Sequence, residues 1–422
     1  MESTAGSIGS QPPHTRLHVH TRRLDDNAPL IEWTDPAHPT VFLRSGEGIV
    51  GFGEAHSIVA HDLTELAGLW ADIASAADIT DDVRMPGTGL VAFGSFAFSP
   101  TSAQPSVLSV PSVIVGRRGG VTWVTRVRHE GDPAVHARGS VLEPVRSDLG
   151  SGFTATLEAG AQTEAGYVQA VTEAIARIGN GVANKVVLAR DLRGIIPLTV
   201  DLRTVIERLA RTYPDTFTFA VDGLIGSSPE TLVTVHGGTA TARVLAGTSA
   251  RGVDDAADAL AAQTIASSPK DLSEHEFAVR TVLSSLAPHG PGFRVEGPYA
   301  LRLPNLWHLA SDVSGELTDG STALDLVAAL HPTAAVAGSP TDVALETIAE
   351  LEPFDRGRYA GPVGWVDANG DGEWAVALRC ARFEEGRVTA FAGAGIVADS
   401  VPARELAETK LKFRPIVDAL GD

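Results

Sequence analysis

The stretch GPVGWVDANGDGEWAVALRC, residues 361–380, consists of two apolar runs joined by DANGDG. Asn-Gly and Asp-Gly favour the positive φ angles of a tight turn, so the two runs are predicted to pair as antiparallel strands. DANGDG also resembles the start of an EF-hand calcium loop, but the twelfth position of that loop needs glutamate and here is Leu378. A hairpin turn is therefore the better interpretation.

Helices and strand pairs alternate around this hairpin. Seven segments are predicted to be helices, and in the first of them Val168, Val171, Ile175 and Ile178 recur on one face. These segments span about residues 163–179, 200–211, 254–267, 270–287, 322–330, 340–350 and 402–419. Strands are predicted in KVVLAR (185–190), TFTFAVDG and LIGSSPETLVTVHG. Tight turns, not helical crossovers, join several strands, which favours an α+β fold with mainly antiparallel sheets.

The beginning of the chain differs in composition from the rest. Residues 1–15 are rich in Ser, Gly, Pro and Gln, which predicts a disordered tail. From residue 16 to about 160, short β-like runs such as LVAFGSFAF and GVTWVTRV alternate with turn residues, so this part is predicted to be β-rich. A length of 422 residues by itself suggests two or three domains.

The charge balance restricts the partners. The chain has 52 acidic residues against 33 Lys and Arg, a formal net charge of −19, and no Lys/Arg-rich run. Nucleic acid is therefore not expected as a partner, whereas a small anion that meets local cations is compatible. No apolar stretch approaches the length of a membrane span, and the start lacks the features of a signal peptide. With Cys380 as the single cysteine, the sequence predicts a soluble, cytoplasmic protein.

Two segments each place two carboxylates three residues apart. Asp271 and Glu274 lie in DLSEHEFAVR (271–280), and Glu405 and Glu408 lie in RELAETKLKF (404–413). On a helix such pairs project from one face. In isolation each pair is more typical of a solvated helix face than of a metal site, so both interpretations stay open on the residues alone.

Ten short stretches, in one order, resemble the chorismate-utilising enzymes, which include isochorismate, salicylate, anthranilate and aminodeoxychorismate synthases. The stretches are NKVVLAR at 184, GSSPETLV at 226, LAGTSARG at 245, SPKDLSEHEFAV at 268, LWHLASDVSGEL at 306, LHPTAAVAGSP at 330, IAELEPFDRGRYAGPVGW at 348, ALRCARF at 377, AGAGIVADS at 392 and ELAETKLK at 405. The resemblance covers about residues 165–420 and, weakly, the region before. It implies a four-layer α/β/β/α core with two mainly antiparallel sheets, in a single large domain over 16–422.

The resemblance also implies an acid and a base. Moving the hydroxyl of chorismate from C4 to C2 requires a base that activates water and an acid that protonates the leaving hydroxyl. Lys185 matches the family's general base, and Glu230 matches its general acid. Burial must favour the neutral form of each, since free lysine is protonated and free glutamate is ionised at neutral pH.

One Mg²⁺ site and a set of substrate contacts follow from the same resemblance. Glu274 and Glu408 would bind Mg²⁺ directly, and Asp271 and Glu405 would help directly or through bound water, with the ring carboxylate of chorismate completing the shell. The implied substrate contacts are Gly247, Thr248, His308, Arg379, Gly393, Gly395 and Lys412. Arg379 and Lys412 would hold the carboxylates, and the glycines would let backbone N–H groups approach. Glu352, Arg356 and Tyr359 fit a structural network behind the site.

Two positions distinguish activities within the family. Ala246 stands where aminodeoxychorismate synthases place a nucleophilic lysine. His331-Pro332-Thr333-Ala334-Ala335 stands where anthranilate synthases have F-P-A-G-T, and the HPT form is associated with isochorismate synthases. These differences favour an isomerase of the isochorismate synthase type. The resemblance further implies that it is Mg²⁺-dependent and monomeric and that it acts in menaquinone or siderophore biosynthesis. A salicylate synthase, which adds pyruvate elimination, is the alternative. A noncatalytic chorismate-binding subunit would lack a base, an acid or a metal ligand, and each of these positions is filled.

Overall fold

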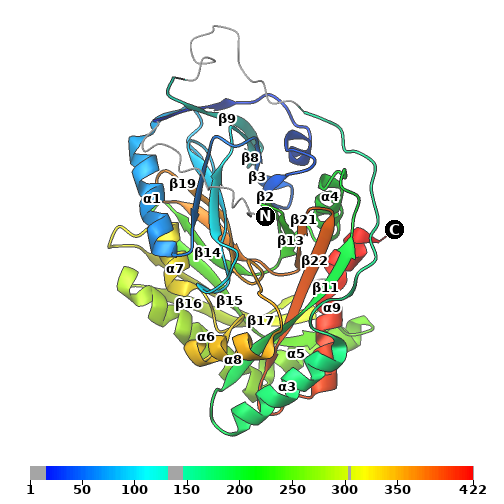
Figure 1. The fold of residues 1–422 in the computed structure, drawn as a ribbon. Coiled ribbons are helices and arrows are strands. Elements are labelled where there is room, and N and C mark those ends of the chain that lie inside the picture. The colour runs from blue at the N-terminus through cyan, green and yellow to red at the C-terminus, as the bar shows by residue number, and fades with distance from the viewer. Residues whose placement is uncertain (1–15, 132–145, 303–305, 422) are drawn as a thin grey trace, which may run out of the picture.

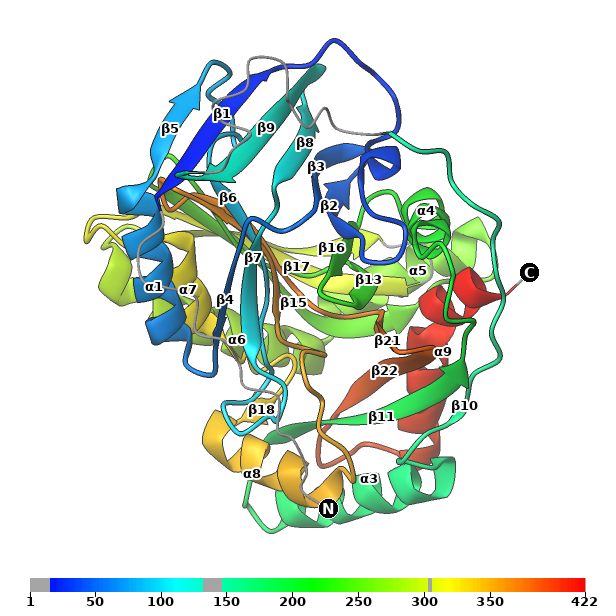
Figure 2. The ribbon, with the colours of Figure 1, turned by 45° about the horizontal axis from the view of Figure 1, so that its top comes forward.

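The computed structural model describes residues 16–131, 146–302 and 306–421, and the side chains of residues 248, 270 and 306 lie outside this description. The tail predicted for residues 1–15 also lies outside it. Two sheets form the centre of the molecule (Figures 1 and 2). Among the described strands only β1 and β5 pair in parallel, so the sheets are mainly antiparallel, as predicted.

The larger sheet joins strands from both ends of the chain. In spatial order it contains β10 (Glu158–Ala159), β11 (Lys185–Ile195), β22 (Arg387–Ile396), β21 (Cys380–Glu384), β13 (Leu224–Ser228), β12 (Phe217–Val221), β2 (Thr40–Arg44), β3 (Glu47–Phe52), β8 (Val113–Arg118), β9 (Val121–His129), β1 (Leu17–Arg23) and β5 (Asp78–Asp81), with β18 (Gly338–Ser339) beside β11. The β12–β2 pairing continues the sheet from the early strands into the later ones.

The smaller sheet also joins strands from both ends of the chain. In spatial order it contains β16 (Arg294–Arg302), β17 (Leu306–Glu316), β15 (Thr239–Ala250), β14 (Thr231–His236), β20 (Gly372–Val376), β19 (Pro362–Asp367), β6 (Val91–Ser95), β7 (Ser106–Val110) and β4 (His56–Ala60). β19 and β20 are the predicted hairpin. In its turn, Oδ1 of Asp367 accepts hydrogen bonds from the backbone N–H groups of Asn369 and Asp371, which fixes the turn.

Helices cover both sheets on their outer faces. On the larger sheet, α3 (Glu164–Gly179), α8 (Thr341–Leu351) and α9 (Pro402–Leu420) pack near β11 and β22, and α4 (Arg203–Thr212) packs on β12 and β13. On the smaller sheet lie α1 (Leu63–Ala76), α5 (Asp255–Ser267), α6 (Pro269–Leu286) and α7 (Ala323–Leu330), and the short 3₁₀ helices are η1 (Leu30–Trp33) and η2 (Ala287–His289). In Figure 2, α9 lies next to β22 and α3 runs below β11. The α/β/β/α prediction is confirmed.

Two local features differ from the prediction. The region 16–160 contains helix α1, whose N-cap Asp62 accepts hydrogen bonds from the N–H groups of Thr64 and Glu65. In addition, LIGSSPETLVTVHG forms two strands, β13 and β14, that belong to different sheets. The break falls at Pro229, which has no N–H for a strand ladder. Glu230 therefore sits where the chain crosses from one sheet to the other.

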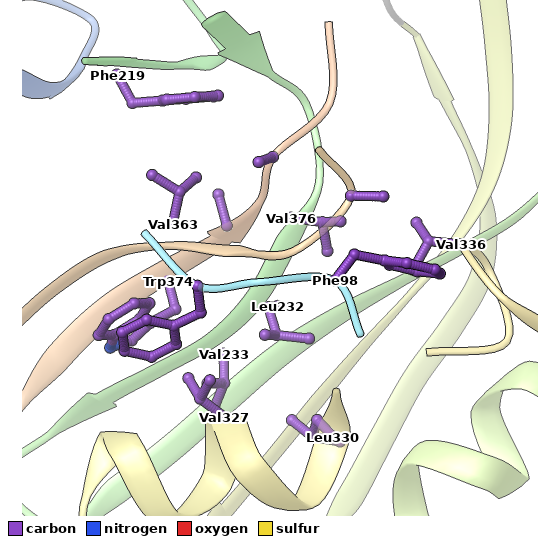
Figure 3. Close-up of a cluster of buried hydrophobic side chains, with 14 of the residues drawn as sticks. Phe98, Phe219, Leu232, Val233, Val327, Leu330, Val336, Val363, Trp374 and Val376 are labelled. Carbon is purple, nitrogen blue, oxygen red and sulfur yellow. The ribbon is translucent and has the colours of Figure 1, made fainter. Parts of the chain in front are cut away.

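The apolar core fixes α7 on the smaller sheet. Val327 and Leu330 of α7 lie close to Leu232 and Val233 of β14, beside Trp374 of β20 (Figure 3). All five side chains are buried, and each aliphatic one contributes about 1.5–3 kcal/mol by leaving water. This packing holds the loop after α7, residues 331–337, next to the inner end of β14. Within the described residues, no helix combines the length and the apolar character that crossing a membrane requires.

Candidate active site

A cavity of about 390 Å³ lies between the two sheets and is bounded by α6 and α9. Its wall contains every predicted site residue except Thr248. These residues are Lys185, Glu230, Gly247, Asp271, Glu274, His308, Arg379, Gly393, Gly395, Glu405, Glu408 and Lys412. The backbone of Thr248 pairs with His308 across β15 and β17, while its side chain lies outside the description. The structure thus brings together residues from segments far apart in the sequence, although their individual roles stay predictions.

Lys185 begins β11 and extends into this cavity. Its Nζ donates a hydrogen bond to Oε1 of Glu274 at 2.8 Å, which links the larger sheet to α6. The neighbouring strand leaves room for the lysine because it carries Gly395. A Cβ at Gly395 would lie 2.8 Å from Cε of Lys185, closer than two carbon atoms can pack. Gly395 therefore acts here by making space for a side chain.

Glu230 is held at the crossing between the sheets by backbone contacts. Its carbonyl oxygen accepts a hydrogen bond from Val376 N–H, and its own N–H donates to Oγ of Ser228. Burial raises the pKa of the Glu230 carboxyl to about 7, although the positive charges of Lys185, Arg379 and Lys412 act in the opposite direction. Near neutral pH this carboxyl therefore exists to a large extent in its protonated form.

Two further cations face the cavity. Lys412 on α9 donates a hydrogen bond to the carbonyl oxygen of Gly393 at 2.8 Å and lies 2.6 Å from Oε1 of Glu408. Burial lowers the pKa of Lys412 and of Arg379. Arg379 has a φ of +50°, a left-handed conformation that is uncommon outside glycine. Among the described residues no acidic side chain forms an ion pair with Arg379, so its guanidinium is available to an anion.

The four acidic residues of the predicted Mg²⁺ site come from two helices. Ser268 caps α6 by accepting a hydrogen bond from Asp271 N–H, which places Asp271 and Glu274 in its first two turns, and Glu405 and Glu408 lie likewise near the start of α9. In the described part of the chain, no three His, Cys, Asp or Glu side chains are close enough together to hold a metal ion. Glu274 and Glu408 form ion pairs with Lys185 and Lys412 instead. The donors are all carboxylate oxygens, which suit Mg²⁺, so the metal site stays a prediction.

His308 and Gly247 meet at the base of the cavity. Nδ1 of His308 lies 3.1 Å from the carbonyl oxygen of Gly247, and burial lowers the pKa of His308 to about 4. His308 is therefore neutral at physiological pH. Gly247 has a φ of +82° and interrupts the β15–β17 register, so the strand bulges here toward the cavity.

Glu352 and Arg356 form the structural network expected behind the site. The two side chains are buried and form an ion pair, and Glu352 also accepts a hydrogen bond from Ala189 N–H at 2.7 Å. Arg356 donates to the carbonyl oxygen of Val187 at 2.7 Å. β18 pairs with β11 only at Lys185 and Val186. For the following residues of β11, the side chains of Glu352 and Arg356 make the hydrogen bonds that a neighbouring strand would otherwise make. Arg356 and Tyr359 also reach the cavity wall.

Three polar residues of the wall belong neither to the predicted site set nor to the predicted structural network. Asp399 and Ser400 lie in the turn before α9, where Oγ of Ser400 accepts a hydrogen bond from Val397 N–H, and Arg404 lies in the first turn of α9. The available signal is the sequence VADS directly after the glycines of β22. It places a turn directly after the end of the strand that carries the predicted site residues Gly393 and Gly395.

The family model for chorismate binding enzymes matches residues 10–421, which is nearly the whole chain. The chain belongs to the chorismate binding enzyme family. Isochorismate synthase DhbC from Bacillus subtilis is 42% identical over 268 residues, 60% of this chain and 67% of that protein. Isochorismate synthase EntC from Escherichia coli K12 is 37% identical over 261 residues, with shares of 60% and 67%.

One solved structure has the same architecture over nearly the whole length. MenF, described as the menaquinone-specific isochorismate synthase from Escherichia coli, superposes with a TM-score of 0.82 at 25% identity. The superposition covers 97% of this chain and 96% of that chain. The N-terminal strands are thus part of the shared fold, together with the segment that carries the ten motifs.

Proposed function

We propose that this protein is a Mg²⁺-dependent isochorismate synthase, an isomerase that converts chorismate into isochorismate. One observation carries the proposal. A buried carboxyl with a pKa of about 7, Glu230, shares a cavity with the cations Lys185, Arg379 and Lys412. This set provides an acid, a base and anion-binding groups for a substrate with two carboxylates. The names of the relatives support the same activity.

Substrate binding is assigned to two cations that line the cavity. Arg379 offers a planar fork that matches a carboxylate in a bidentate arrangement, and Lys412 offers a point charge. Local charge thereby overcomes the net charge of −19 for a small anionic ligand.

The reaction is assigned to Lys185 and Glu230. Lys185, in its neutral form, takes a proton from water while the water oxygen bonds to C2 of the ring. The two ring double bonds shift by one position each, the C4–O bond breaks, and Glu230 donates its proton so that the C4 hydroxyl leaves as water. Glu230 is suited to this role because an acid whose pKa lies near the working pH is both protonated and able to release its proton.

In the structure the Lys185 side chain is held by its ion pair with Glu274, so its nitrogen is not free to approach a water molecule. Lys185 must leave Glu274 before it can act as a base. Glu274 and Glu408, helped by Asp271 and Glu405, would hold Mg²⁺, which when bound supplies positive charge for the ring carboxylate. Occupation of Glu274 by another cation would release Lys185 toward the substrate.

Water is proposed as the nucleophile because a covalent mechanism would need the amine of a lysine at position 246. The residue that lines the cavity there is Ala246. All of these groups come from one chain, so the monomer is proposed to be active.

The test is to incubate the purified protein with chorismate and Mg²⁺, resolve the products by chromatography and measure pyruvate. Isochorismate without pyruvate, lost when the metal is chelated, is expected. Salicylate with equal pyruvate would instead indicate the salicylate synthase activity, and absence of turnover would contradict both.

A further inference from the structure

A second cavity of about 270 Å³ lies directly behind Glu230. It is enclosed by β14, β15, α6 and the loop that follows α7. Glu230, Leu245 and Ala335 line both this rear cavity and the active-site cavity. Glu230 is thus a titratable residue in the partition, the wall that separates the two cavities. On the side away from Lys185 it faces the rear cavity.

The rear cavity extends from the partition to the protein surface. Its wall includes Ala329 at the end of α7, which is exposed, and Ser285 and Thr281 on α6, which are partly exposed. At the inner end lies Thr333, close in sequence to the shared residue Ala335. The cavity therefore connects the neighbourhood of Glu230 with solvent without passing through the space assigned to chorismate.

Thr333 indicates what the rear cavity contains. Its Oγ1 is buried and has no hydrogen-bond partner among the described residues. A buried hydroxyl without a partner is costly, and the usual partner in such a position is an ordered water molecule. A cavity of this size has room for several waters, since one water occupies about 30 Å³ in the liquid.

The proton balance of the reaction leaves Glu230 without its proton after each turnover. In each turnover Lys185 gains a proton from the attacking water and Glu230 loses one to the leaving hydroxyl. Before the next turnover Glu230 must be protonated again, while product or new substrate fills the active-site cavity. On the basis of the proposed function, we infer that the rear cavity is a water-filled proton path from solvent to Glu230, with Thr333 as a positioning residue that holds its inner water.

Two variants test this inference in different ways. Thr333→Val keeps the shape of the side chain and removes the hydroxyl, whereas Ala278→Leu adds volume to the wall formed by α6. Ser284→Leu is the matched control, because Ser284 lies on the same helix, is exposed and does not line the cavity. None of the three residues lines the active-site cavity.

Both test variants are expected to lower kcat by about fivefold or more, with KM for chorismate unchanged. The loss is smaller than that expected from removal of the general acid itself, because Glu230 is still present. They are also expected to increase the solvent deuterium isotope effect on kcat, because reprotonation of Glu230 becomes slower. Purely structural damage would not increase this isotope effect. Ser284→Leu should behave like the wild type.

Wild-type kcat and isotope effect in folded Thr333→Val would overturn the inference, as would a change in KM alone. This variant decides the question if Ala278→Leu does not fold. Failure of the wild type to make isochorismate would instead overturn the proposed function. The two failures are therefore distinguishable.

Discussion

Nζ of Lys185 lies 2.8 Å from Oε1 of Glu274, so the predicted base is paired with a predicted metal ligand. The same relationship recurs at Lys412, whose Nζ lies 2.6 Å from Oε1 of Glu408. An ammonium group and Mg²⁺ compete for the same carboxylate oxygens. Metal binding and release of the two lysines are therefore expected to be linked.

Replacing Lys185 with methionine should strengthen Mg²⁺ binding while it abolishes activity. The variant removes a competing cation from Glu274, and a partly exposed ion pair of this kind is worth up to about 1 kcal/mol, or several-fold in affinity. Titration calorimetry with MgCl₂ in the absence of chorismate measures this. Lys410→Met is the control, because Lys410 is on α9 but pairs with Glu164 outside the cavity. Weaker Mg²⁺ binding in Lys185→Met would contradict the linkage.

Glu230→Gln should lower kcat by about 10²–10⁴-fold, the usual contribution of a general acid, with little change in KM. Glutamine keeps the shape of the side chain but has no proton to donate at C4. Steady-state kinetics with chorismate measures the effect. Glu384→Gln is a suitable control because Glu384 is exposed on β21 and does not line the active-site cavity. A Glu230→Gln enzyme with wild-type kcat would remove Glu230 from the mechanism.

The activity should decline above neutral pH. Glu230 acts in its protonated form, and burial raises its pKa to about 7, so the active form is present below pH 7 and is lost as pH rises through that value. Where Lys185 is already neutral, the alkaline limb of kcat/KM reports Glu230 in the free enzyme and is expected near pH 7. Bound chorismate adds negative charge and should move the corresponding limb of kcat to higher pH. A kcat/KM profile that is flat from pH 6 to 9 would contradict this assignment.

Gly395→Ala should lower kcat without unfolding the protein. The added Cβ would lie 2.8 Å from Cε of Lys185, so the lysine must move away from its present position. Displacement of a base from its substrate costs on the order of 10²-fold in rate. Gly179→Ala is the control, because a Cβ at Gly179 meets no atom within 4 Å. Circular dichroism should show both variants folded, and equal kcat values would show that Lys185 does not need the space.

Glu352→Gln should destabilise the protein by about 3 kcal/mol, because it leaves the buried Arg356 charge without its partner. Urea unfolding measures the free energy of unfolding. Glu350→Gln, two residues earlier, removes an exposed partner of Arg177 and should cost less than about 1 kcal/mol. Similar losses in the two variants would indicate that the Glu352–Arg356 pair is not what supports β11.

Local sequence patterns were sufficient to predict much of this fold. The apolar spacing in residues 163–179 predicts α3 to within one residue, and the turn residues of DANGDG predict the β19–β20 hairpin. Helix α1 is less evident because only Leu66 and Trp70 of its side chains are buried, so its apolar stripe is narrow. The N-cap Asp62 was the available signal for its start.

Features that depend on tertiary packing could not be predicted in the same way. Lys185 and Glu274 are 89 positions apart, and no local pattern indicates that they form an ion pair. The raised pKa of Glu230 results from its burial at the crossing between two sheets. The rear cavity likewise depends on how α6 and the loop after α7 pack on β15. The family motifs predicted which residues gather around the cavity, but not their contacts with one another.

The central claim is that solvent water attacks C2 while the C4 hydroxyl leaves. The most direct measurement is mass spectrometry of isochorismate formed by the wild-type protein from unlabelled chorismate in H₂¹⁸O with Mg²⁺. The account predicts one ¹⁸O atom in each product molecule, located in the C2 hydroxyl. Isochorismate without ¹⁸O would mean that the original hydroxyl is transferred within the substrate, which would contradict the roles assigned to Lys185 and Glu230.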